Sequence, residues 1–169
     1  MSQSEWYALR VRRRFERIVA VRLEHQNIEH YLPLRRIVRQ CGAALTRAIE
    51  LPLLPEYVFC KASPEMQRSL LTVPGVLNAL RDAPALDRKI ADLKRISQSG
   101  LTALHWPFTE KGNAITLDSG SLKGITGVLN SSTSDKPVLV VSIDTIRRSV
   151  GVRLDGEFTF SSARKGAAA

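Results

Sequence analysis

The sequence predicts an α+β fold in two parts: a split βαβ sandwich, with helices packed on an antiparallel sheet, followed by a small β-barrel. The first part contains hydrophobic patterns in the order strand, helix, strand, hairpin, strand, helix, strand. Glycine is also unevenly placed, because two of the ten glycines lie before residue 100 and eight lie from residue 100 onward. This change in composition indicates a boundary between two domains.

The first elements are distinguished by their hydrophobic spacing. A strand is predicted over 6–11 and a helix over about 14–26, in which Phe15, Ile18, Val19 and Leu23 recur at helical spacing. Asn27 is a suitable residue for ending that helix. Further strands are predicted over 28–34 and, as a hairpin around Cys41-Gly42, over 35–40 and 44–50.

An apolar strand and a capped helix follow the hairpin. The strand is predicted over 57–62, and Ser63-Pro64-Glu65 begins the helix. A hydroxyl cap, a proline whose missing N–H costs nothing in the first turn and an early negative charge all favour that start. The helix is expected to end near Thr72, before a strand over 76–81 and an amphipathic helix over about 87–97.

The second part is a series of short β candidates separated by turn residues. They span 113–117, 127–130, 137–143, 147–150 and 152–154, with 131–135 as a hairpin tip. The expected domains are therefore residues 1–98, a linker over 99–111, the barrel over 112–160 and a flexible tail over 161–169. So few residues leave room only for a small barrel.

The positive charge is concentrated in the first part and consists of guanidinium groups. The chain of 169 residues has a formal net charge of +9. From Arg10 to Arg47 there are ten arginines and no lysine against three glutamates, which leaves +7 in this stretch. Arginine matches phosphate and base edges with a planar fork, so this bias points to a polyanionic partner more than a lysine-rich surface would. On charge alone, a solvated face is an equally good interpretation.

Several classes of protein are disfavoured by what the sequence lacks. Cys41 and Cys60 are too few for a disulfide framework and too far apart for a zinc motif, which fits a reducing cytoplasm. No apolar run approaches the length of a membrane span. His25, His30 and His105 accompany no recognised nucleophile motif, and no phosphate-binding glycine loop occurs. We therefore expect a monomeric cytoplasmic protein that is not an enzyme and has no cofactor, metal or membrane partner.

Three local patterns occur in an order that resembles the NusG family of bacterial transcription elongation factors. The first is Trp6-Tyr7, followed by a basic run and Phe15-Glu16 at the head of a helix. The second is the PLLPEYVF segment of residues 52–59, in which Leu54 replaces the family's usual aromatic residue and Glu56 its usual glycine or small polar residue. The third is the SGSLKGITGV segment of residues 119–128, which is similar to the KOW signature of an SH3-like barrel. The resemblance implies an NGN-like domain followed by a KOW domain.

The resemblance implies that the first domain binds the RNA polymerase clamp and suppresses pausing or termination. Tyr57 and Phe59 lie two residues apart on one face of their strand. An exposed pair of rings there would bind a helical hairpin of the polymerase. The alternative is that both rings are ordinary core residues of the sheet. The candidate polymerase-binding residues are Tyr7, Leu32, Pro33, Pro55, Tyr57 and Phe59.

The basic run lies where the specialised members of the family touch the exposed non-template DNA strand. The candidate nucleic-acid-binding residues are Arg10, Arg12, Arg13, Arg14 and Arg17. These side chains contact either phosphates alone or bases as well. A second set on the hairpin, Arg35, Arg36, Arg39 and Arg47, either touches upstream duplex or remains solvated.

The KOW domain is implied to recruit a partner, which in general family members is ribosomal protein S10 or the termination factor Rho. Its candidate contacts are Ile125 and Ile146. The stretch from Arg147 to Val150 resembles the specialised RfaH/UpxY-type antiterminators more than the general factor. An alternative is a KOW-bearing RNA-binding or ribosome-associated module, in which the arginines bind RNA directly.

Overall fold

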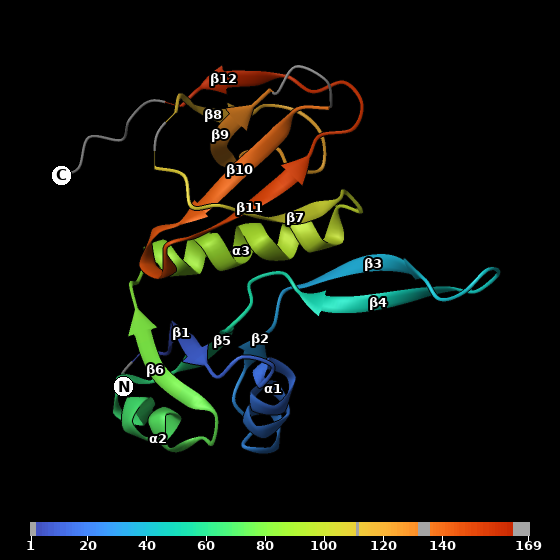
Figure 1. Ribbon diagram of the computed structural model, residues 1–169. Coiled ribbons are helices and arrows are strands. Elements are labelled where there is room, and N and C mark those ends of the chain that lie inside the picture. The colour runs from blue at the N-terminus through green and yellow to red at the C-terminus, as the bar shows by residue number, and fades with distance from the viewer. Residues whose placement is uncertain (1–2, 111, 132–135, 164–169) are drawn as a thin grey trace. The chain divides into compact units, whose positions relative to one another are not determined.

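The computed structural model describes residues 3–110, 112–131 and 136–163. The chain divides into two compact units, Met1–Ile90 and Ala91–Ala169, and the division falls inside helix α3, Ala85–Gln98 (Figure 1). The predicted face of this helix is confirmed, since Leu86, Ile90, Leu93 and Ile96 are all buried.

The first unit is built on a four-stranded antiparallel sheet. Its strands are β1 (Glu5–Val11), β2 (His30–Tyr31), β5 (Tyr57–Ala62) and β6 (Val76–Arg81), in the order β2-β5-β1-β6. β1 pairs with β5 on one side and with β6 on the other. The predicted strand over 28–34 is shorter than expected, because Pro33 has no N–H with which to extend the pairing of β2.

Helices pack on one face of this sheet and bury its main core. These are α1 (Glu16–His25), a 3-10 turn (Pro64–Met66) and α2 (Gln67–Thr72). The core cluster includes Tyr7, Leu9, Val19, Leu23 and Leu70. α1 ends as predicted, because Asn27 adopts a left-handed φ of 55° and the N–H of Ile28 then bonds the Leu23 carbonyl at 2.9 Å.

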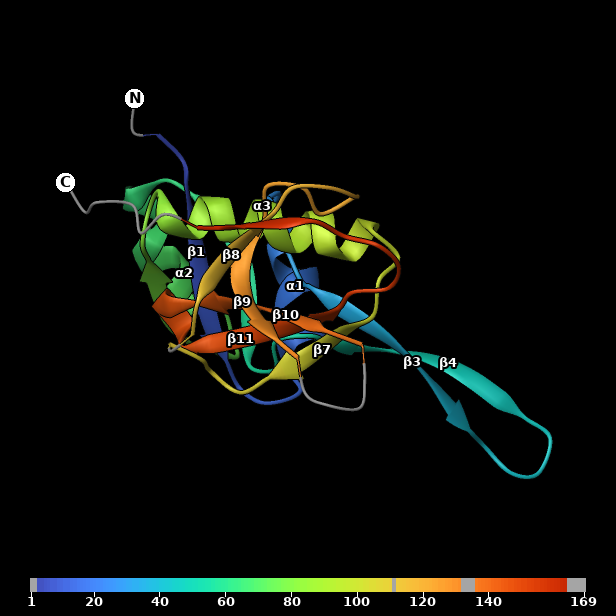
Figure 2. The same cartoon turned by 90° about the horizontal axis from the view of Figure 1, so that it is seen from above.

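A long hairpin leaves the first unit as a separate two-stranded sheet. β3 (Leu34–Gln40) and β4 (Thr46–Pro52) pair along their whole length. Figures 1 and 2 show this ribbon projecting away from the four-stranded sheet and its helices. Its base is fixed by a 2.8 Å hydrogen bond from the N–H of Leu53 to the Pro33 carbonyl.

The second unit is a six-stranded antiparallel sheet. Its strands are β7 (Ala103–Trp106), β8 (Ala114–Leu117), β9 (Thr126–Asn130), β10 (Val138–Ile143), β11 (Arg148–Arg153) and β12 (Phe160–Ser162). The order is β12-β8-β9-β10-β11-β7, and among the described residues no pairing joins the two edge strands to close a barrel. A short 3-10 turn, Asp144–Ile146, connects β10 to β11.

Three expectations for this half of the chain were wrong in detail. The linker expected over 99–111 contains β7, which pairs with β11. The strands expected over 147–150 and 152–154 are one strand, because β11 pairs with β10 without interruption. Gly151 in its middle lies against the ring of Trp106, to which a Cβ would come within 2.7 Å. The tail expected to be flexible contributes Ser161 and Ser162 to β12, while 164–169, like most of the predicted hairpin tip at 132–135, lies outside the described residues.

Candidate nucleic-acid interface

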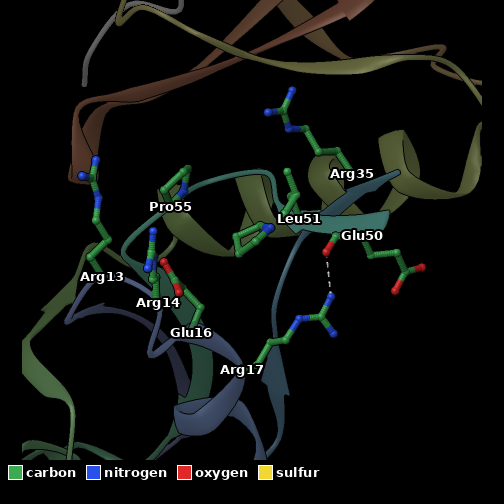
Figure 3. Close-up of a pocket in the computed structure, with 9 residues that line it drawn as sticks. Arg13, Arg14, Glu16, Arg17, Arg35, Glu50, Leu51 and Pro55 are labelled. Carbon is green, nitrogen blue, oxygen red and sulfur yellow. Dashed lines mark hydrogen bonds between the residues drawn. The ribbon is translucent and has the colours of Figure 1, made fainter. Parts of the chain in front are cut away.

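Four arginines line a cleft of about 440 Å³ between the start of α1 and the base of the hairpin (Figure 3). We call this the arginine cleft, and its lining residues are Arg13, Arg14, Glu16, Arg17, Arg35, Glu50, Leu51, Pro52 and Pro55. Guanidinium groups therefore surround an apolar surface made by a leucine and two prolines. Such a site offers cations for phosphates and an apolar surface for bases.

A tight connection between β1 and α1 places the arginines at the rim. The N–H of Arg12 donates to the Gly75 carbonyl at 2.8 Å, and the N–H of Phe15 donates to the Arg12 carbonyl at 2.9 Å. Arg14 has a left-handed φ of 69°, which turns the chain sharply into the helix. Because these are main-chain contacts, the side chains of Arg12, Arg13 and Arg14 stay exposed.

Glu16 is a buried carboxylate within this basic surface. Its side chain is 5% exposed, and its Oε1 accepts a 2.9 Å hydrogen bond from the N–H of Glu56. Glu56 has a φ of 71°, a conformation that the glycine usual in this motif adopts easily. The turn therefore keeps the backbone shape that a glycine would adopt, although Glu56 occupies the position. The hydrogen bond from Glu56 to Glu16 ties this turn to the first turn of α1.

Two further arginines lie where the cleft meets the hairpin: Arg17 bonds to β4, and Arg35 is part of β3. Arg17 Nη2 donates to the Glu50 carbonyl of β4 at 2.9 Å (Figure 3). The Nε of Arg35 is buried and has no hydrogen-bond partner among the described atoms. Arg13 forms a 3.7 Å ion pair with Glu56, but its side chain is 81% exposed, so this pair contributes little stability.

Comparison with known proteins identifies the first unit. A family model described as transcription termination factor nusG matches residues 4–95, which is more than half of the chain. The chain belongs to the NusG family. One similar solved structure, titled "Domain interaction in Thermotoga maritima NusG", has a TM-score of 0.54 and 18% identity, and the match covers 89% of this chain and 93% of that one. At this identity the structural match shows the fold, and a search of curated proteins found no match.

In this NusG-family chain, the five arginines of the predicted basic run do not all line the same site. Arg13, Arg14 and Arg17 line the arginine cleft, whereas Arg10 and Arg12 are exposed outside it. Arg35, which the sequence placed with the hairpin, lines the same cleft. Sequence reasoning missed Glu50, Leu51 and Pro52 as site residues, because only the tertiary fold brings the base of the hairpin to the start of α1. It also missed Glu16, which lies within the basic run but has the opposite charge.

The aromatic pair expected on the surface is buried. Tyr57 is 6% exposed and Phe59 is 0% exposed, so the expectation of an exposed pair of rings was wrong. The two do share a face of β5, where Phe59 stacks on Tyr31 with ring centroids 6.5 Å apart. The burial of both rings shows that this face of β5 is covered, as well as the face on which the helices pack.

The other candidate contacts divide between core and surface. Tyr7 is fully buried in the helix-side core and Pro33 is buried, whereas Leu32 is half-buried and Pro55 is exposed. In the second unit, Ile125 and Ile146 are 0% and 4% exposed. Both isoleucines are therefore core residues of that unit: Ile125 follows the turn before β9, and Ile146 is the last residue of the 3-10 turn between β10 and β11.

Within 3–110, 112–131 and 136–163, no group of three or more His, Cys, Asp and Glu side chains is placed to hold a metal ion. No described helix combines the length and apolar character needed to cross a membrane.

Proposed function

We propose that this NusG-family protein is a transcription elongation and antitermination factor that binds the RNA polymerase clamp through its first unit and suppresses pausing or termination. The observation that carries the proposal is the arginine cleft, which lies within the matched NusG domain. Its cations and apolar surface suit the DNA strand that a transcribing polymerase leaves unpaired.

The proposed polymerase-docking surface consists of Leu32 and Pro55, which flank the buried aromatic strand. Pro55 is exposed, and Leu32 packs only partly against the core. A few apolar anchors of this kind supply most of the energy in many protein interfaces.

The second unit is proposed to be an SH3-like KOW module that recruits a partner such as ribosomal protein S10 or Rho. Its KOW-like loop is held by Arg95, whose Nη2 donates to the carbonyls of Ser121 at 3.0 Å and Lys123 at 2.7 Å. With Leu122 and Ile125 buried, the loop presents the exposed residues Ser121 and Lys123 to a partner. The arginines at 147 and 148 support assignment to the specialised antiterminator branch.

The test is co-purification with core RNA polymerase, followed by a pausing assay with the same proteins. Leu32→Asp is expected to reduce polymerase capture at least tenfold, because one buried apolar anchor contributes about 1.5 to 3 kcal/mol. Leu71→Asp is the matched control, since Leu71 is 45% exposed on α2, away from the proposed surface. Equal capture of both variants would remove Leu32 from the docking surface, and RNA binding without any polymerase capture would favour an RNA-binding module.

A further inference from the structure

The arginine cleft has the size and the charge of a site for one small anionic molecule. Its volume of about 440 Å³ lies within the range of roughly 300 to 1,000 Å³ that is usual for small-molecule sites. All of its lining residues belong to the first unit. In formal charge, four arginines against two glutamates leave the lining at +2. The cleft therefore favours a compact ligand that carries several negative charges.

Arg35 contributes a hydrogen-bond donor that the described part of the protein leaves unpaired. Its Nε is buried and has no partner among the described atoms. In Figure 3 the guanidinium groups of Arg13 and Arg14 lie on one side of Pro55 and Leu51, and that of Arg35 lies on the other. A buried donor without an acceptor is destabilising, and a ligand oxygen bound in the cleft supplies the acceptor.

The cleft also offers contacts that an inorganic anion has no means to use. Leu51, Pro52 and Pro55 form an apolar surface against which a base can pack. Glu16 uses its Oε1 for the N–H of Glu56, and its Oε2 accepts no hydrogen bond from the described residues. A carboxylate oxygen of this kind can accept the hydroxyl of a ribose. Cations, an apolar wall and a carboxylate together match the three parts of a nucleotide.

We propose that the arginine cleft binds a free ribonucleoside triphosphate. Its phosphates pair with the arginines, its base packs on the apolar wall, and a ribose hydroxyl donates to Glu16. A nucleotide in the cleft occupies the arginines that contact single-stranded DNA, so the two ligands exclude each other. This consequence rests on the proposed function, whereas nucleotide binding itself does not. The supply of nucleotides then regulates how readily the cleft binds DNA.

The experiment titrates the full chain in a calorimeter, without DNA or polymerase, with GTP, ATP, guanosine and inorganic triphosphate. One test variant is Arg35→Gln, and its matched control is Arg36→Gln. The control removes the same charge from the next residue of β3, which is exposed and does not line the cleft. A second test variant, Arg13→Gln, changes a side chain that is 81% exposed, where loss of a charge has little effect on stability. Fluorescence anisotropy then measures whether GTP displaces a labelled single-stranded oligonucleotide.

The wild type is expected to bind GTP or ATP saturably and to release the oligonucleotide as the cleft fills. Arg35→Gln and Arg13→Gln are each expected to weaken nucleotide binding about tenfold, because each loses a charge-assisted hydrogen bond to phosphate. Arg36→Gln stays within about twofold of the wild type. Guanosine and inorganic triphosphate each bind at least about tenfold more weakly than GTP, because the first lacks the phosphates and the second lacks the base and the ribose.

Three results of the titration overturn the proposal: no saturable binding of either nucleotide, an equal loss of affinity in Arg36→Gln, or inorganic triphosphate that binds as tightly as GTP. An oligonucleotide that stays bound at saturating GTP overturns the mutual exclusion of the two ligands. A wild type that binds GTP but no single-stranded DNA contradicts the DNA contact of the proposed function and still supports the nucleotide site.

Discussion

The carboxylate of Glu16 accepts a 2.9 Å hydrogen bond from the backbone N–H of Glu56, forty residues later in the chain. This contact joins the first turn of α1 to the turn that precedes β5. Both sides of the arginine cleft therefore depend on one buried acidic side chain.

Replacement of Glu16 tests this structural role. Glu16→Leu is expected to lower the free energy of unfolding by about 1 to 3 kcal/mol, because the N–H of Glu56 loses its acceptor. Glu16→Gln keeps an oxygen at that position and is expected to lose less than half as much. Urea denaturation followed by circular dichroism measures both values, and equal losses in the two variants would contradict a hydrogen-bonding role.

The arginine cleft predicts a change in single-stranded DNA binding. Arg13→Gln with Arg14→Gln is expected to reduce the salt slope for a single-stranded oligonucleotide by about 1.4, at roughly 0.7 per phosphate contact. Fluorescence anisotropy over a salt series measures this slope. The paired substitution Arg68→Gln with Arg88→Gln serves as the control. Identical slopes for wild type and cleft variant would show that these two arginines touch no phosphate.

Burial of the aromatic strand predicts loss of stability. Phe59→Ala is expected to destabilise the first unit by about 3 to 5 kcal/mol, because the side chain is fully buried and stacked on Tyr31. Phe160→Ala, at a ring that is 49% exposed, is expected to cost less than about 1 kcal/mol. Thermal unfolding measures both, and a Phe59→Ala protein as stable as the wild type would contradict the packing described here.

The two cysteines are expected to differ in reactivity. Burial raises the pKa of the Cys60 thiol to about 12, whereas Cys41 is exposed near the tip of the hairpin. A thiol reagent at pH 8 should therefore label one cysteine in the native protein and two after denaturation. Rapid labelling of both in the native state would show that Cys60 is accessible.

The same shift has a consequence at alkaline pH. The folded state retains the Cys60 proton up to a pH of about 12, while the unfolded chain loses it near the ordinary value of 9.0. The folded state therefore binds more protons in this window, and the contribution of Cys60 to stability decreases as the pH rises above 9. A Cys60→Ala variant should show a smaller decrease in unfolding free energy between pH 9 and pH 10.5.

The elements of the first unit were predictable because their signals are local. The strand over Tyr57–Ala62 and the hairpin around Cys41-Gly42 appear where apolar spacing and turn residues indicated them. The exposure of Tyr57 and Phe59 was not predictable in this way. It depends on what covers that face of β5, and the residues of one strand do not specify what packs against it.

The site was only partly predictable for the same reason. The basic run is evident in the sequence, but its division into cleft residues and other exposed arginines depends on where the base of the hairpin meets α1. The link between Glu16 and Glu56 spans too many residues for any periodic pattern to indicate it. The strand β7 was missed because its four residues alternate too briefly to distinguish them from a linker.

The hairpin shares no strand with the sheet of its unit, since β3 and β4 pair with each other alone among the described strands. An isolated two-stranded ribbon is marginally stable in water, so the contacts at its base supply much of the stabilisation that keeps the two strands paired. The core of the unit therefore places few restrictions on which residues the ribbon carries. Charge, length and tip sequence can therefore change in the outer part of the ribbon without repacking the rest of the unit, provided that the base residues of the cleft are kept.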